Sequence, residues 1–147
     1  MPRERFRSAE NRESGFTLIE LLVVMIIIGI LAAIAIPVFL SQRTKAQDAA
    51  TKADVSKIGK EIATYYVDGT AVPTIAVAAN RYTLTPALGA AQDLGKASIG
   101  ITVLTSNALT STQWCVSLQN SYSNTKIWKY SAHSGLAQGD CVAADVA

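Results

Sequence analysis

The sequence has few of the side chains that usually carry catalysis. Its 147 residues include one histidine, His133, and two cysteines, Cys115 and Cys141. His133 stands among serine, alanine and glycine residues, a composition typical of a turn, and no motif pairs it with a nucleophile. P-loop, G-x-G-x-x-G and EF-hand patterns are also missing from the sequence. We therefore expect no enzyme activity, no catalytic residues and no cofactor.

Metal ligands are similarly scarce. Two thiols cannot by themselves complete a four-ligand zinc site. Asp140 and Asp145 near the C-terminus are carboxylates that could contribute to a calcium site, but solvated loop carboxylates are the simpler interpretation. We therefore predict no metal site.

Charge is also sparse, and this limits nucleic-acid binding. Charged residues make up 16% of the chain and the formal net charge is +2, whereas a protein that coats nucleic acid carries a dense basic face. The aromatic residues Trp114, Tyr122, Trp128 and Tyr130 are more typical of a sheet than of a base-stacking platform. Nucleic-acid binding stays an open, minor alternative.

What the sequence does contain is a long apolar run. Phe16 to Leu40 reads FTLIELLVVMIIIGILAAIAIPVFL, and Glu20 is its only ionisable side chain. A helix needs about 20 apolar residues to cross a bilayer. Arginines upstream favour a cytoplasmic N-terminus, although Arg43 and Lys45 on the other side weaken the contrast. We predict a single-pass protein of the cytoplasmic membrane, with its C-terminal domain outside.

Three interpretations of this run compete. It could be a plain anchor, an ordinary secretory signal cut at Ala33-Ile34-Ala35, or a signal cut ahead of the run so that the helix is kept. A secretory core has about 7–15 apolar residues, which is shorter than this run. A carboxylate such as Glu20 costs about 2–3 kcal/mol at mid-membrane and less near the edge, so it usually has a role. Both observations disfavour the secretory signal.

Gly15 to Glu20, with the sequence GFTLIE, resembles the processing motif of type IV pilins and the related pseudopilins. In that family a dedicated aspartic peptidase cuts after the glycine and methylates the new N-terminus. The resemblance covers about residues 14–60. It implies a leader of residues 1–15, cleavage between Gly15 and Phe16, N-methylation of Phe16, and Glu20 as an assembly contact with the Phe16 amine of a neighbouring subunit.

The resemblance also implies a function and partners. The expected protein is a structural subunit of a type IV pilus or pilus-like filament, a helical homo-oligomer found first in membrane lipid and then at the cell surface. The implied partners are a prepilin peptidase, an assembly ATPase and membrane platform proteins. The alternatives are a minor pilin, a pseudopilin of a secretion or DNA-uptake system, and a membrane-tethered binding module that does not polymerise.

Two residues weaken the apolar helix. Pro37 has no N–H, and its ring clashes with the carbonyl of Ala33. Gly29 costs about 1 kcal/mol relative to alanine. The stretch between them could unwind when subunits pack and make the filament extensible, as in related pili. The alternative is a static kink.

The helical pattern continues beyond Leu40 to Tyr66, so that a helix over residues 16–66 would be about 75 Å long. We interpret residues 16–40 as the transmembrane or filament-core part, and residues 41–147 as a head domain. An apolar stripe at steps of three and four comprises Thr51, Val55, Ile58, Ile62 and Tyr65. The side chains expected mostly on solvated faces are Lys45, Asp48, Lys52, Lys57, Lys60 and Glu61.

The rest of the head reads as a small sheet. Strands are expected at 99–105, 113–119 and 126–132 and around 141–142, with a turn at 121–125. Residues 74–98 contain Pro86 and Gly89, and we expect a loop there. The predicted fold class is α+β and pilin-like, with a long N-terminal transmembrane helix packed against a small antiparallel sheet.

The two cysteines allow one intramolecular pairing. In an exported chain Cys115 and Cys141 are expected to form a disulfide that closes a loop of about 27 residues. On the chain-entropy model this cross-link stabilises the domain by about 3–4 kcal/mol. By resemblance to pilins, the loop is expected to form exposed surface and subunit contacts.

Overall fold

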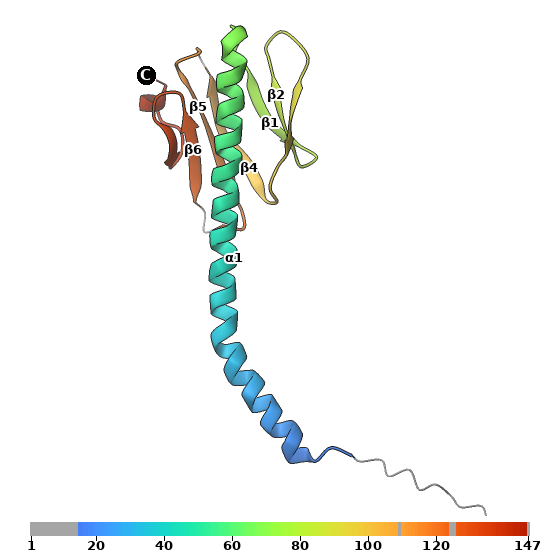
Figure 1. Ribbon diagram of the computed structural model, residues 1–147. Helices are drawn as coiled ribbons and strands as arrows, with labels where there is room; N and C mark the ends of the chain where they lie inside the picture. The colour runs from blue at the N-terminus through green and yellow to red at the C-terminus, as the bar shows by residue number, and fades with distance from the viewer. Residues whose placement is uncertain (1–14, 109, 124–125, 147) are drawn as a thin grey trace, which may run out of the picture. The chain divides into compact units, whose positions relative to one another are not determined.

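The computed structural model describes residues 15–108, 110–123 and 126–146 (Figure 1). The expected leader, residues 1–15, lies outside the described residues except for Gly15. The chain divides into two compact units, Met1–Phe39 and Leu40–Ala147, and each is described by itself. One helix, α1, runs through Leu18–Asp68 and so belongs to both units.

Helix α1 begins and ends at recognisable caps. At its start the Glu20 N–H donates to Thr17 Oγ1 at 3.3 Å, and the Thr17 N–H donates to Glu20 Oε2 at 2.8 Å, which is a capping box. At its end the Gly69 N–H donates to the Tyr65 carbonyl at 2.8 Å. The helix thus starts and stops two residues later than the predicted 16–66, and it continues without a break through Pro37.

The first unit consists largely of exposed apolar helix. Within the described residues, α1 is the one helix long and apolar enough to cross a membrane. None of its most apolar stretch is buried. A helix that is apolar on all sides needs lipid or other helices around it.

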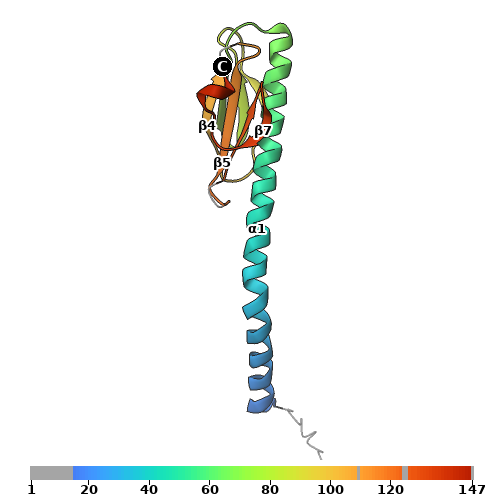
Figure 2. The same cartoon turned by 90° about the vertical axis from the view of Figure 1, so that its left-hand side faces the viewer.

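The second unit contains two antiparallel sheets beside α1 (Figures 1 and 2). The first has the order β1-β2-β3, formed by Thr74–Ala78, Arg81–Thr85 and Gln92–Lys96. The second has the order β4-β5-β6-β7, formed by Ile101–Ala108, Trp114–Asn120, Ile127–Ser131 and Gly135–Gln138. The predicted α+β class, with one long apolar helix and antiparallel strands, is confirmed.

The core of this unit lies between α1 and the sheets. The predicted apolar stripe is confirmed, because Thr51, Val55, Ile58 and Ile62 are buried and Tyr65 packs at the edge of the core. Of the side chains expected on solvated faces, Asp48 is wrongly placed, since it is only 8% exposed and pairs with Lys126. The strands contribute the buried residues Ile75, Tyr82, Leu84, Leu94, Trp114, Val116 and Leu118.

Polar contacts between α1 and the sheets accompany this core. The carboxylate of Asp54 accepts a hydrogen bond from the Tyr82 hydroxyl at 2.8 Å and from the Ser98 N–H at 2.9 Å. Near the start of the second unit, Asn120 Nδ2 donates to Gln47 Oε1 at 3.1 Å. These directional bonds fix the position of each sheet along the helix, which apolar packing alone leaves free to slide.

Two sequence predictions about the strands are wrong. Residues 74–98 form β1, β2 and β3 rather than a loop, because Pro86 and Gly89 fall in the connection between β2 and β3 and interrupt no strand. The segment around 141–142 is not a strand. The fourth strand of the second sheet is β7, and a short 3-10 helix, Ala143–Asp145, follows it.

Strand β5 is also more buried than its alternating sequence suggests. Trp114 to Leu118 are all buried, on both faces of the sheet. One face packs on α1, and the C-terminal segment covers the other, where Cys115 bonds to Cys141 and the Ser117 hydroxyl donates to Asp140. The strand predicted at 113–119 is therefore an interior strand that is buried on both faces from Trp114 to Leu118.

At Gly59, α1 lies directly against the side chain of Tyr130 on β6. A Cβ added to Gly59 would lie 2.3 Å from Tyr130 Cδ1 and 2.5 Å from Cγ. Because the ring base cannot swing away freely, we expect Gly59→Ala to destabilise the second unit by about 1–3 kcal/mol. Urea unfolding of the detergent-solubilised chain, followed by tryptophan emission, measures this, since Trp114 stacks on Tyr130.

The matched control for this prediction is Gly29→Ala. A Cβ there meets nothing within 4 Å. We expect Gly29→Ala to leave the unfolding free energy of the second unit unchanged. Equal effects of the two alanines would show that helix propensity, not the contact with Tyr130, governs Gly59.

Candidate functional site

The GFTLIE motif surrounds the start of α1. Gly15 and Phe16 precede the helix, and Phe16 is 89% exposed. Glu20 Oε2 accepts hydrogen bonds from both the backbone N–H and the hydroxyl of Thr17, each at 2.8 Å. The carboxylate is therefore held back toward Phe16. Thr17 is a functional candidate that the sequence interpretation missed, although the T-x-x-E capping pattern is visible in the sequence.

The peptide bond between Gly15 and Phe16 and the carboxylate of Glu20 both lie at the exposed start of α1. A peptidase could reach the bond between Gly15 and Phe16, because both residues are exposed and outside the helix. Cleavage would create an α-amine at Phe16, which is charged at neutral pH since its pKa is near 8. On an apolar helix, this amine and the Glu20 carboxylate are opposite charges that each need a partner when they are buried.

The two weak points of the apolar helix lie within regular α1. Gly29 and Pro37 are both helical, and no side chain packs over Gly29. The single chain therefore keeps this stretch wound. The unwinding predicted between Gly29 and Pro37 would occur only when subunits pack into a filament, so the single chain does not test it.

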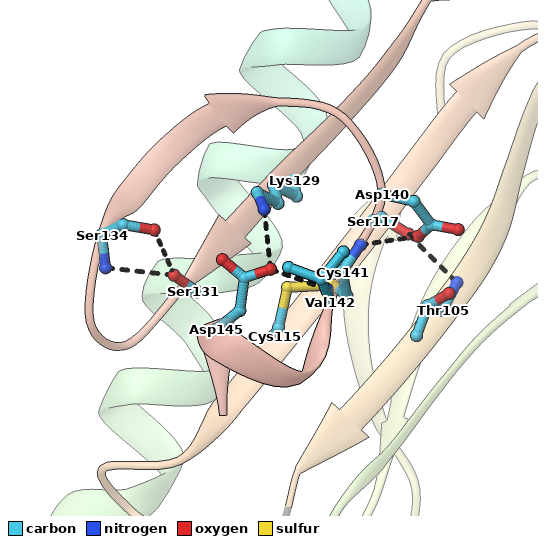
Figure 3. The surroundings of a disulfide bond; sticks show 10 residues. All are labelled: Thr105, Cys115, Ser117, Lys129, Ser131, Ser134, Asp140, Cys141, Val142 and Asp145. Atoms are coloured by element: carbon cyan, nitrogen blue, oxygen red, sulfur yellow. Dashed lines mark hydrogen bonds and ion pairs between the residues drawn. A yellow bond between two sulfur atoms is a disulfide. The ribbon is translucent and has the colours of Figure 1, made fainter. Parts of the chain in front are cut away.

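A second candidate site is the C-terminal segment around the disulfide (Figure 3). Cys115 on β5 bonds to Cys141, which follows β7, with the two Cα atoms 5.9 Å apart. The half-cystine on β5 is only 1% exposed. The disulfide therefore fastens the end of the chain to the central strand of the second sheet.

Two carboxylates reinforce the same attachment (Figure 3). Asp140 accepts hydrogen bonds from the Ser117 hydroxyl and, at 2.7 Å, from the Cys141 N–H. Asp145 pairs with Lys129 Nζ at 2.6 Å and accepts the Val142 N–H at 2.8 Å. Both carboxylates considered as calcium ligands thus have protein partners. The described part of the chain contains no group of three or more metal-ligating side chains.

These partners stabilise the ionised carboxylates. The Ser117 hydroxyl, above all, holds the pKa of Asp140 below its ordinary value of 3.8. Burial by itself would raise the pKa of Asp145, but Lys129 and the Val142 N–H lower it below 3.8 overall. A carboxyl pKa that is lower in the folded chain adds stability above the unfolded pKa, and this stability is lost as the pH falls through the folded pKa.

We therefore expect the melting temperature of the second unit to fall as the pH drops below about 4. Calorimetry between pH 6 and pH 2 measures this fall. The double variant Asp140→Asn/Asp145→Asn should start lower at pH 6 and lose less on acidification. Asp68→Asn, at an exposed helix end, is the control and should follow the parent. Parallel curves for the double variant and the parent would contradict the assignment.

The other residues singled out from the sequence lie apart from these sites. His133 lies exposed in the turn between β6 and β7. Trp114 is buried and stacks on Tyr130, and Trp128 lies under Lys52, whose Nζ is 4.1 Å from its ring centroid. Tyr122 is 57% exposed. These aromatic rings do not form one exposed platform.

Comparison with known proteins finds its matches in the segment that contains the first site. Residues 11–36 match the family model of the prokaryotic N-terminal methylation motif. The type II secretion system core protein G of Pseudomonas aeruginosa is 40% identical over 64 residues, which are 44% of this chain and 45% of that protein. The type IV major alpha-pilin of Moraxella bovis is 38% identical over 92 residues, which are 63% of this chain and 49% of that pilin.

A third relative is the type IV narrow pilus major component PilA5 of Thermus thermophilus. It is 41% identical over 63 residues, or 43% of this chain and 54% of that protein. The chain thus spans about half the length of the curated relatives it matches. No solved structure gives a significant match. The N-terminal segment, which carries the methylation motif on an exposed apolar helix, is therefore similar to the corresponding segments of type IV pilins and of type II secretion core protein G.

Proposed function

We propose that this protein is a structural subunit of a type IV pilus or pilus-like filament. A prepilin peptidase cleaves after Gly15 and methylates Phe16, and the subunits then polymerise through their N-terminal helices. The observation that carries the proposal is the methylation motif at residues 11–36, directly on a helix whose apolar residues are exposed. A membrane covers such a helix in the monomer, and neighbouring helices cover it in a filament.

Glu20 is the proposed assembly contact. In an apolar helix bundle, the carboxylate of one subunit and the Phe16 amine of the next form a buried ion pair. Apolar helices alone can slide past one another, so the pair would set their axial register. The exposure of Phe16 and the orientation of Glu20 toward the chain start support this role.

Gly29 and Pro37 are the proposed points at which the helix opens on packing. Pro37 leaves the Ala33 carbonyl without its helical partner, and Gly29 is the weakest helix former of the stretch. Unwinding between them would let the filament extend under load. A filament map with continuous helix from Leu21 to Leu40 would contradict this role.

The route to the filament needs further partners. We propose that the unprocessed chain spans the cytoplasmic membrane once, with residues 1–15 inside and the head, residues 41–147, outside. The disulfide supports this topology, since disulfides persist in oxidising compartments. A cytoplasmic assembly ATPase and an integral-membrane platform would then extract the subunit from the lipid.

Two observations bear on the kind of filament. The match to the Moraxella alpha-pilin extends over 63% of this chain, against 44% for the Pseudomonas core protein G. The match to the Thermus pilus component covers only 43% of this chain, however, so coverage leaves both a pilin and a pseudopilin as candidates. Shearing of cells tests the choice: a major pilin dominates the sheared fraction, whereas a minor pilin or a pseudopilin is scarce there.

Crosslinking in isolated envelopes tests polymerisation itself. A filament subunit gives a ladder of multimers under an amine-reactive crosslinker. A membrane-tethered binding module that does not polymerise gives a monomer band, and this outcome would contradict the proposed function.

A further inference from the structure

The second unit exposes apolar side chains at both of its ends. Beyond Leu40, eight large apolar side chains are exposed in the described part of this unit. Three of them, Leu104, Leu136 and Val142, lie on the strands of the second sheet or on the segment that follows it. The other five lie at the two ends of the part of α1 that the sheets cover: Val67, Val72 and Leu88 at one end, and Ile99 and Tyr122 at the other. Side chains that remain in water gain nothing from burial, so both ends are candidates for surfaces that a partner covers.

The first end is a projecting tip formed by Ile99, Gly100, Ser121 and Tyr122, which lie before β4 and after β5. The Ser121 N–H donates to the Gly100 carbonyl at 2.9 Å and joins the two segments. A Cβ on Gly100 would lie 2.4 Å from Tyr122 Cδ2, so the tyrosine ring rests directly on the glycine backbone. Ile99 is 69% exposed and Tyr122 is 57% exposed. The tip therefore presents two large side chains from a fixed backbone.

The second end is a hollow between the last turns of α1 and the connection from β2 to β3. Its volume is about 550 Å³, and its apolar walls include Tyr65, Pro86 and Leu88. The Tyr65 hydroxyl donates to the Ala71 carbonyl at 3.0 Å, which holds one wall in place. Pockets that take up whole small molecules have volumes of about 300–1,000 Å³. The hollow therefore has room for large side chains such as those of the tip.

The two ends also carry complementary charges. The hollow is lined by the carboxylates of Glu61 and Asp68. At the other end Asn120, which bonds to the Ile99 carbonyl, also bonds to Gln47 of α1, and the exposed Arg43 lies one turn before Gln47 on the same face of the helix. None of the ion pairs between described residues includes Arg43, Glu61 or Asp68. A cation beside the tip thus matches carboxylates in the hollow, as at electrostatically complementary interfaces.

The positions of the tip and the hollow determine what kind of contact they can make. Gln47 beside the tip and Asp68 at the hollow are separated by about 30 Å along α1. The two surfaces therefore cannot meet within one molecule. A contact between different surfaces of identical chains is head-to-tail, and it repeats from copy to copy as an open filament or a ring instead of closing a dimer.

We propose that the tip of one subunit docks in the hollow of a second copy of this chain, so that the second units stack end to end along the filament. This inference rests on the polymerisation in the proposed function. It adds a contact between the second units to the contact between the apolar helices, and it names the residues on each side: Ile99, Tyr122 and Arg43 on one copy, and Leu88, Glu61 and Asp68 on the next.

Cysteine crosslinking in sheared filaments tests the proposal. The two native cysteines are bonded to each other, so introduced thiols are the free ones. Ile99→Cys/Leu88→Cys places one thiol on the tip and one at the hollow of every full-length chain, and a short bismaleimide joins thiols that lie close together. Tyr122→Cys/Thr70→Cys is a second such pair, in case the first pair fails to assemble. Ile99→Cys/Leu136→Cys is the matched control, because Leu136 is 43% exposed on β7 opposite Tyr130 and belongs to neither surface.

We expect both tip-and-hollow pairs to give a ladder of covalent multimers on a non-reducing gel, with several-fold more multimer than the control pair. Ile99→Cys alone should remain monomeric, because its thiol faces a surface without one. Dimers from Ile99→Cys alone would indicate a tip-to-tip contact and would overturn the inference. Filaments of the tip-and-hollow pairs that yield no more multimer than the control pair would overturn this inference alone. A parent chain that forms no filaments would contradict the proposed function itself.

Discussion

Glu20→Ala is expected to abolish filament assembly while leaving membrane insertion intact. Insertion depends on the apolar run, from which alanine removes the one charged side chain, whereas assembly in the proposed filament depends on the pairing of the carboxylate with the Phe16 amine of a neighbour. Breaking a buried ion pair by removing one partner typically costs about 3–5 kcal/mol, enough to reduce polymerisation by two orders of magnitude or more. Electron microscopy of sheared fractions and flotation of the membrane-bound pool measure the two effects separately.

The capping box makes a sharper design possible. Glu20→Ala removes both the charge and the bond to the Thr17 N–H. Glu20→Gln keeps a side chain that can complete a capping box but removes the charge, and it should also fail to assemble. Thr17→Ala removes the cap while keeping the carboxylate, and it should still assemble. Normal filaments from Glu20→Gln would show that the cap, and not the ion pair, is what the filament needs.

Removal of the disulfide is expected to cause the largest loss of stability in the second unit. The cross-link between Cys115 and Cys141 joins residues 26 apart in sequence. On the chain-entropy model its loss costs about 3–4 kcal/mol, a large share of the 5–15 kcal/mol typical of a domain. Urea unfolding of Cys115→Ser/Cys141→Ser, compared with the parent, measures the change in the free energy of unfolding.

Cys141→Ser alone is the control for this prediction. It breaks the cross-link but leaves the buried side chain of Cys115 on β5 unchanged. A loss close to that of the double variant would assign the effect to the cross-link. Unfolding free energies equal to that of the parent would mean that the bonds of Asp140 and Asp145 already hold the segment in place.

The parts of the fold with strong periodicity could be predicted from the sequence. The stripe from Thr51 to Ile62 repeats at helical spacing over three turns, and its burial follows from that spacing alone. The apolar run and its single carboxylate likewise indicated a membrane helix and a special role for Glu20. Such patterns involve residues that are close in sequence, so they can be recognised without knowledge of the tertiary structure.

The first sheet was not predicted because each of its sequence signals, the turn residues and the strand patterns, is weak. The turn between β1 and β2 is formed by Ala79 and Asn80, which both have positive φ values, of 48° and 58°. Alanine is an unusual residue at such a turn, where asparagine and glycine normally mark a hairpin. The strands on either side have five residues each, which is too short for periodicity to identify them.

The burial of β5 and of Asp48 depends on partners distant in sequence. From the sequence alone, Ser117 is expected to face solvent. In the structure, the C-terminal segment, which is attached through Cys141, covers it, and the Ser117 hydroxyl donates to Asp140. Asp48 reads as a solvated helix residue until Lys126 meets it from the turn after β5. Local patterns contain no information about either pairing.

The most direct test of the central claim is the intact mass and N-terminal sequence of the protein purified from cell envelopes. A filament subunit processed at GFTLIE begins at N-methylated Phe16. A chain that begins at Ile36 would instead be an ordinary secreted domain, and one that keeps Met1 would be a simple membrane anchor. Either of the last two results would contradict the proposed function.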